Sequence, residues 1–164
     1  MTRTFRFFAS SWLLLAAGCD PAADSGGAAS DQPAALPSTV TSQDFGAYEL
    51  HFNAQETNRL TTEIALEHGI TRSASRGMLT VSVLRKREGA VPMPVAADVT
   101  VSAVNLSDQY RALSPRAIRE ADALYYIAET PISDGETLIF TINAIPENET
   151  APLTVRFMRR FFVD

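Results

Sequence analysis

Alternation of apolar and polar side chains is the feature that most constrains the fold of this chain. It is clearest in residues 48–53, 78–87, 95–106, 138–144 and 153–163. A period of two residues places every second side chain on one face of a β-strand, so each segment predicts a strand with one buried face. We expect residues 78–87 and 95–106 to pair as a hairpin.

The segments between these strands predict one short helix and further strands. Residues 58–68 have apolar side chains at helical spacing, and Gly69 can end the helix in a left-handed conformation. Residues 110–120 are polar and include Pro115, which places them at the end or edge of a sheet. Residues 123–130 are apolar on both faces and predict a central strand.

About seven short strands, one short helix and regularly spaced turns predict an all-β fold for residues 43–164. We expect an antiparallel β-sandwich of immunoglobulin or fibronectin type. A small lipocalin-like barrel is the alternative. The apolar phases of the strands give the predicted core: Tyr48, Leu50, Phe52, Leu79, Val81, Val83, Val99, Val101, Ile127, Leu138, Phe140, Ile142, Val155 and Phe157.

The N-terminus has the pattern of a signal peptide over residues 1–18. Arg3 and Arg6 precede a short apolar run that ends in small residues directly before Cys19. This resembles the lipobox of bacterial lipoproteins, in which a diacylglyceryl group is joined to the cysteine sulfur, although Ala16 stands where leucine is usual. We expect Cys19 to become the lipid-bearing first residue of a membrane-anchored protein.

Residues 19–42 are predicted to be the lipidated cysteine followed by a disordered tether. After Cys19 the segment is almost entirely Ala, Ser, Gly, Pro, Asp and Thr, which cannot bury enough apolar surface to fold. The predicted location is therefore the periplasm, with the lipid in the inner or the outer membrane.

Charge and cysteine content exclude several classes of function. Removing Arg3 and Arg6 leaves 12 of the 14 basic side chains against 19 acidic ones, a net charge of −7, which argues against nucleic acid as a partner. Cys19 is the only cysteine, so once acylated it leaves no thiol for disulfides, metal binding or catalysis.

Several short motifs resemble those of the proteobacterial family called domain of unknown function 4426. The resemblance implies a small exported protein whose activity is uncharacterised, and it identifies no catalytic residue. The motifs that carry it are Phe45-Gly-Ala-Tyr-Glu-Leu-His-Phe-Asn-Ala54, Gly69-Ile-Thr-Arg-Ser73 with Arg76-Gly77, Val81-Ser-Val-Leu84, Ile118-Arg-Glu120 and Tyr125-Tyr-Ile-Ala-Glu129.

The sequence offers few candidates for catalysis or metal binding. It has no Gly-x-Ser-x-Gly pattern and only two histidines: His51 on the polar phase of a strand, and His68 at a helix end, where it can interact with the last carbonyls. No spacing of His, Asp or Glu matches a zinc or calcium motif. We therefore expect no metal and no cofactor. The sequence leaves enzymatic activity undecided and favours a protein that is not an enzyme.

The loop of residues 71–77 is the candidate site for an anion or partner. Arg72, Ser73 and Arg76 could bind a carboxylate or phosphate, since guanidinium groups match these anions bidentately. The alternative is that the two arginines pair with acids of the domain, such as Glu120, Asp122 or Glu129, and hold the loop in place.

Two functions remain open. The first is a membrane-tethered module that binds or assembles with another envelope protein through its loops or a sheet edge. The second is a small-ligand carrier or enzyme whose pocket is built from residues distant in sequence. The absence of a catalytic motif favours the first.

Overall fold

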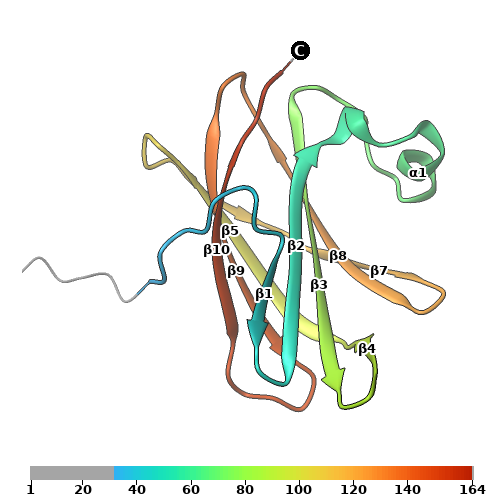
Figure 1. Cartoon of the computed structure of the whole chain (residues 1–164). Coiled ribbons are helices and arrows are strands. Elements are labelled where there is room, and N and C mark those ends of the chain that lie inside the picture. The colour runs from blue at the N-terminus through green and yellow to red at the C-terminus, as the bar shows by residue number, and fades with distance from the viewer. Residues whose placement is uncertain (1–31, 164) are drawn as a thin grey trace, which may run out of the picture. The chain divides into compact units, whose positions relative to one another are not determined.

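The computed structural model describes residues 32–163, which form ten strands, one 3-10 turn and one short helix (Figure 1). The predicted signal peptide, Cys19 and the first part of the predicted tether lie outside the described residues. The elements are β1 Ser42–Phe45, β2 Tyr48–Glu56, η1 Thr57–Arg59, α1 Thr62–Glu67, β3 Arg76–Arg87, β4 Ala90–Pro94, β5 Ala97–Asn105, β6 Tyr110–Leu113, β7 Arg116–Glu120, β8 Ala123–Pro131, β9 Thr137–Pro146 and β10 Leu153–Arg160.

The strands form two antiparallel sheets packed as a sandwich. The six-stranded sheet has the order β1-β2-β3-β8-β7, with β4 paired to part of β3, and the four-stranded sheet has the order β10-β9-β5-β6. The predicted sandwich is confirmed, and the lipocalin-like alternative is wrong because these two sheets do not close into one barrel. The described residues form ten strands and not the predicted seven or so. The additional strands were not predicted because short strands such as β1 and β4 show little alternation of buried and exposed residues.

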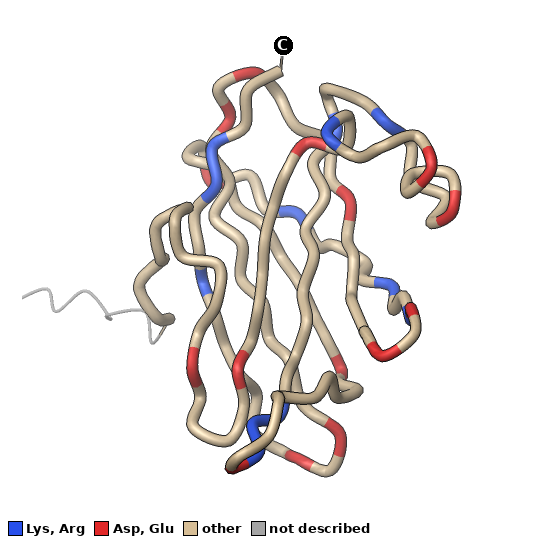
Figure 2. Tube along the Cα trace, turned by 45° about the vertical axis from the view of Figure 1, so that its right-hand side comes forward, with Lys and Arg blue, Asp and Glu red and all other residues tan. Residues whose placement is uncertain are grey.

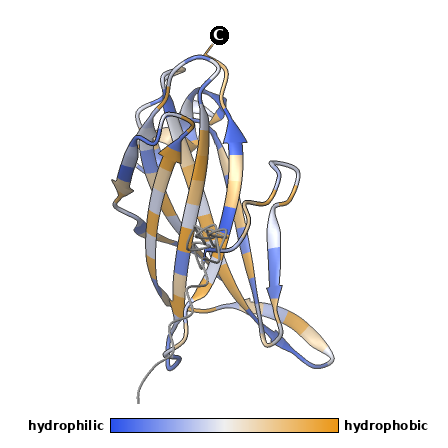
Figure 3. Ribbon diagram, turned by 90° about the vertical axis from the view of Figure 1, so that its left-hand side faces the viewer, coloured by the Kyte–Doolittle hydropathy of each residue, from blue (hydrophilic) through white to orange (hydrophobic). Residues whose placement is uncertain are grey.

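Side chains from the inner faces of both sheets form the core. All the residues predicted for the core are buried. In β9 the alternation is complete: every second residue is buried, and the Phe140 ring stacks on Phe157 with 5.2 Å between centroids. The bands of hydrophobic residues along the strands are visible in Figure 3, and Figure 2 shows that charged residues lie mostly near strand ends and in loops.

The predicted hairpin of residues 78–87 and 95–106 is wrong. After β3 the chain turns at Gly89, which has φ +68°, and continues into the short strand β4. β3 pairs with β4. β5 lies in the other sheet, between β9 and β6. Alternation shows which face of a strand is buried but carries no information on which strand it pairs with. β4 was predicted to be a loop because it contains two prolines.

Part of the segment predicted as tether lies against the domain. Leu36 bridges to Phe157, and its backbone N–H donates to the Arg156 carbonyl at 2.8 Å while its carbonyl accepts from Met158 N–H at 2.8 Å. The Leu36 side chain also packs on the core. This segment therefore covers the free edge of β10, and the packed region begins before residue 43.

The predicted central strand and the predicted edge segment are both confirmed. β8 lies inside the six-stranded sheet between β3 and β7, and Pro115 separates β6 from β7, each of which ends its own sheet. Because β8 is apolar on both faces, it presents Ile127 to the outside of the sandwich, where α1 covers it.

Within the described residues, no helix has the length and apolar character needed to cross a membrane.

Candidate functional site

The outer face of the six-stranded sheet has a hollow of about 230 Å³ beside α1. Four buried residues, Ala65, Ile70, Met78 and Ile127, form a small apolar cluster there, separate from the sandwich core. The apolar lining of the hollow comes from Leu60, Ile64, Ile70, Met78, Ile118 and Ile127, and its polar rim includes His68 and Glu120. Residues distant in the sequence thus meet at one surface depression.

Local sequence signals place α1 at this hollow. Thr61 caps the helix, because its side chain accepts a hydrogen bond from the Ile64 N–H at 3.3 Å. The helix ends after Glu67, and Gly69, with φ +61°, reverses the chain so that the Ile70 N–H donates to the Ala65 carbonyl at 2.7 Å. This reversal buries Ile70 under the helix and leaves His68 at the rim of the hollow.

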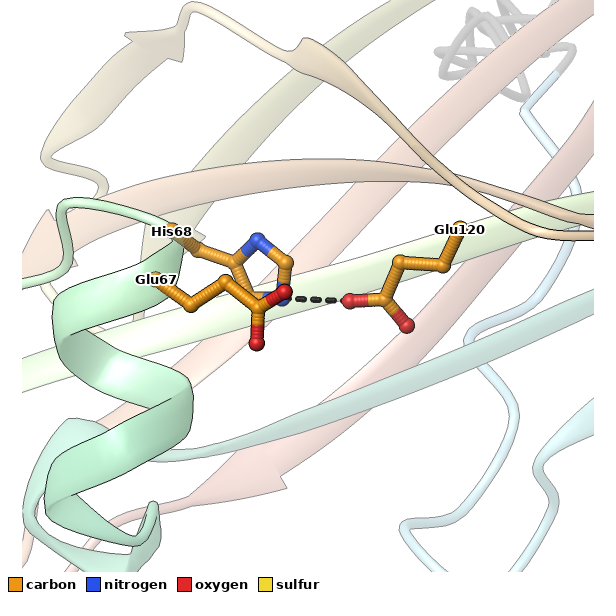
Figure 4. A group of neighbouring side chains, drawn as sticks. All are labelled: Glu67, His68 and Glu120. Atoms are coloured by element: carbon orange, nitrogen blue, oxygen red, sulfur yellow. Dashed lines mark ion pairs between the residues drawn. The ribbon is translucent and has the colours of Figure 1, made fainter.

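The polar rim of the hollow joins the end of α1 to β7. His68 Nε2 lies 2.5 Å from Glu120 Oε1, and the His68 side chain is only 14% exposed (Figure 4). Arg116, also on β7, donates to the His68 carbonyl. The sequence predicted an interaction of His68 with the last helix carbonyls; its side-chain partner in the structure is Glu120.

The two arginines of the 71–77 loop have different partners. Arg72 donates to the Thr62 hydroxyl at 3.0 Å and to the Asn58 carbonyl at 2.9 Å, so it holds the loop to η1 and α1. Arg76 lies 3.3 Å from Glu129 on β8, one of the acids suggested as a structural partner. Both guanidinium groups therefore have partners within the domain.

Ser73, the third residue of the candidate anion site, is held by its own contacts. Its backbone N–H donates to the Thr57 hydroxyl at 2.9 Å, and its side-chain oxygen lies 2.9 Å from that of Ser75. Anion or partner binding by Arg72, Ser73 and Arg76 stays a prediction.

A buried polar junction, which was not predicted from the sequence, joins the loop of residues 71–77 to the end of β2. Thr57 is fully buried and donates from its hydroxyl to the Thr71 carbonyl at 2.9 Å. Burial alone would raise the pKa of Glu56, but hydrogen bonds from its own N–H, from Arg59 Nε at 2.6 Å and from the Phe162 N–H hold that pKa below its usual value. The sequence did contain a signal for this junction, because Glu56 stands at a position of β2 where the alternation calls for a buried apolar residue.

The other histidine, His51, also lies beside a glutamate. Its Nε2 is 3.3 Å from Glu49 Oε1 on the same strand, and its side chain is 44% exposed. Both histidines of the chain therefore lie near a carboxylate, but only His68 borders the hollow beside α1.

Two packed antiparallel sheets with a partly covered hollow on one outer face define a small all-β sandwich domain. Residues 42–164 match the family described as Domain of unknown function (DUF4426), and the chain belongs to this family. It is similar to the crystal structure of a DUF4426 family protein from Pseudomonas aeruginosa PAO1, with 33% identity, a TM-score of 0.64, and coverage of 75% of this chain and 94% of that one. None of the curated proteins matches the chain.

Proposed function

We propose that this protein is a lipid-anchored binding module of the bacterial cell envelope. The sandwich presents the hollow beside α1 to another envelope protein, which inserts an apolar side chain there. The observation that carries the proposal is this hollow, because two of its lining residues, Ile64 and Tyr125, are themselves 43% and 36% exposed. Leu66, which is 76% exposed, adds apolar surface elsewhere on α1. Exposed apolar groups around a depression are typical of interaction sites.

The size of the hollow favours a protein partner over a small-molecule ligand. Pockets that bind drug-sized ligands usually have volumes of about 300–1,000 Å³. The hollow measures about 230 Å³ and lies open at the surface beside a single short helix. A cavity of this size suits one or two side chains of a partner.

The anchor is supported by the sequence alone. Arg3 and Arg6, the apolar run and the small residues before Cys19 converge on lipidation of that cysteine. Replacing Cys19 by Ala should move the protein from the membrane fraction to the periplasmic fraction. Unchanged sedimentation with membranes would contradict the anchor without affecting the proposed binding surface.

Site-specific photocrosslinking in intact cells tests the binding surface. A photoreactive amino acid at Leu66, on α1, should give a discrete adduct with one envelope protein. The matched control is the same amino acid at Val91 on β4, which is equally exposed but lies away from the hollow (80% against 76%). Ile64→Glu should remove the Leu66 adduct without lowering the melting temperature, since Ile64 is 43% exposed. Identical adducts from positions 66 and 91 would contradict the proposal.

A further inference from the structure

We propose that Glu67, His68 and Glu120 form a binding site for a divalent transition-metal ion of the zinc type. Each residue offers one ligand atom, and the three atoms all lie within 4.8 Å of one another (Figure 4). An imidazole nitrogen and two carboxylate oxygens are ligands that zinc accepts. This inference goes beyond the proposed binding module and does not rest on it.

The distances between these atoms suit a shared ion. Zinc–ligand distances near 2.1 Å in tetrahedral geometry place neighbouring ligand atoms about 3.4 Å apart. The three ligand atoms lie within 4.8 Å of one another, and the one close pair, His68 Nε2 and Glu120 Oε1 at 2.5 Å, has to move apart by about 1 Å to share an ion. Rotation of the exposed glutamate side chains is enough to adjust them.

The backbone explains why the three residues converge. Adjacent residues within a helix do not face each other. His68, however, has left the helix, with φ −98° and ψ 7°, so its imidazole lies beside the Glu67 carboxylate. The bond from Arg116 to the His68 carbonyl holds this helix end against β7, the strand that carries Glu120.

Electrostatics favour a divalent cation at this position. The two glutamates contribute two formal negative charges within a few ångströms of each other, and a divalent cation balances both.

The ligand types narrow the choice of metal. Imidazole suits zinc, copper, iron and nickel, whereas oxygen-only sites suit magnesium and calcium. Three protein ligands leave a fourth position for water on zinc. The imidazole is mostly buried and so positioned in advance, while both glutamates are exposed and accessible to an ion from solvent.

Zinc titration by calorimetry tests the site. The untagged full chain carries Cys19→Ser in every sample, because a free thiol is itself a zinc ligand. The expected result is saturable binding of one zinc ion, weakened about tenfold or more by each of His68→Ala, Glu67→Gln and Glu120→Gln, since even loss of an outer-shell contact commonly costs 10–100-fold. Zinc should also raise the melting temperature of the parent protein more than that of Glu120→Gln.

The chain contains its own control. His51→Ala removes the other histidine, which also lies near a glutamate, and should leave zinc affinity unchanged. Should His68→Ala fail to fold, the two isosteric Gln variants at exposed positions still decide the question. Three results would each overturn the proposal. They are no saturable binding at millimolar zinc, an equal loss of zinc affinity in His51→Ala and His68→Ala, and unchanged zinc affinity in both Gln variants.

Discussion

The two faces of the six-stranded sheet are covered very differently. The inner face packs on the second sheet, and Leu50, Leu79 and Val83 on it are at most 1% exposed. The outer face has one cluster of four buried residues, and its principal helix is the six-residue α1. The two faces therefore differ in what they bury: the inner face holds most of the buried apolar side chains, and the outer face leaves apolar surface exposed.

This difference follows from strand composition. Most strands bury alternate residues only, whereas β8 and the start of β3 are apolar on both faces and so need a second cover. The chain supplies it through the segment from η1 to Ile70, which is too short to cover the whole outer face. Incomplete cover of an apolar surface leaves the hollow.

The largest expected effect is on the inner face. Phe140 is fully buried and contacts the rings of Phe157 and Phe161, at centroid distances of 5.2 and 6.3 Å. Phe140→Ala should therefore lower the free energy of unfolding by about 3–5 kcal/mol, through lost burial and a residual cavity. Urea titration measures this change. A loss below that of the outer-face variant described next would contradict the comparison.

A smaller effect is expected on the outer face. Ile70 is 7% exposed and belongs to the cluster of four. Ile70→Ala should cost about 2 kcal/mol, near the lower end for such truncations, because α1 can settle into the space. The same variant should weaken the photocrosslink at Leu66, which Phe140→Ala should leave intact as long as the protein is folded. Equal unfolding losses from both variants would show that the two faces are one cooperative core.

The sequence predicted the inner face well because one physical rule governs it. Alternation assigns each strand a buried phase, and residues such as Leu138 and Phe157 are buried as that rule requires. Ile127 was also predicted to be buried, but it belongs to the outer cluster. In a strand that is apolar on both faces, periodicity cannot distinguish one layer from the other.

The outer face was not predictable in the same way. Glu67 and His68 are neighbours in the chain, but Glu120 joins them only because β7 returns beside β8 at the edge of the sheet. Strand partners depend on the whole topology, and the hairpin predicted for residues 78–87 and 95–106 failed for that reason. Glu56 is different, because a charged residue in the apolar phase of β2 is itself a local signal of a buried polar junction.

The smallest expected effect concerns this junction, which links the inner core to the outer segment. Glu56 is 3% exposed. Burial alone would raise its pKa, but hydrogen bonds from its own N–H, from Arg59 and from the Phe162 N–H hold that pKa below its usual value in the folded protein. The unfolded chain then binds the proton more readily, so this stabilisation is complete above the unfolded pKa of about 4.3 and is lost as pH falls through the folded pKa. Glu56→Gln should cost about 1 kcal/mol at pH 7, because glutamine keeps one accepting oxygen and loses mainly the charge, and a hydrogen bond to a charged group contributes about 1.5–3 kcal/mol against about 1 kcal/mol for a neutral one. Urea titrations at pH 7, 5, 4 and 3 measure the free energy of unfolding of the parent protein and of Glu56→Gln. The difference between these two free energies should become smaller as the pH falls. A difference that does not change with pH would mean that the charge of Glu56 does not stabilise the junction.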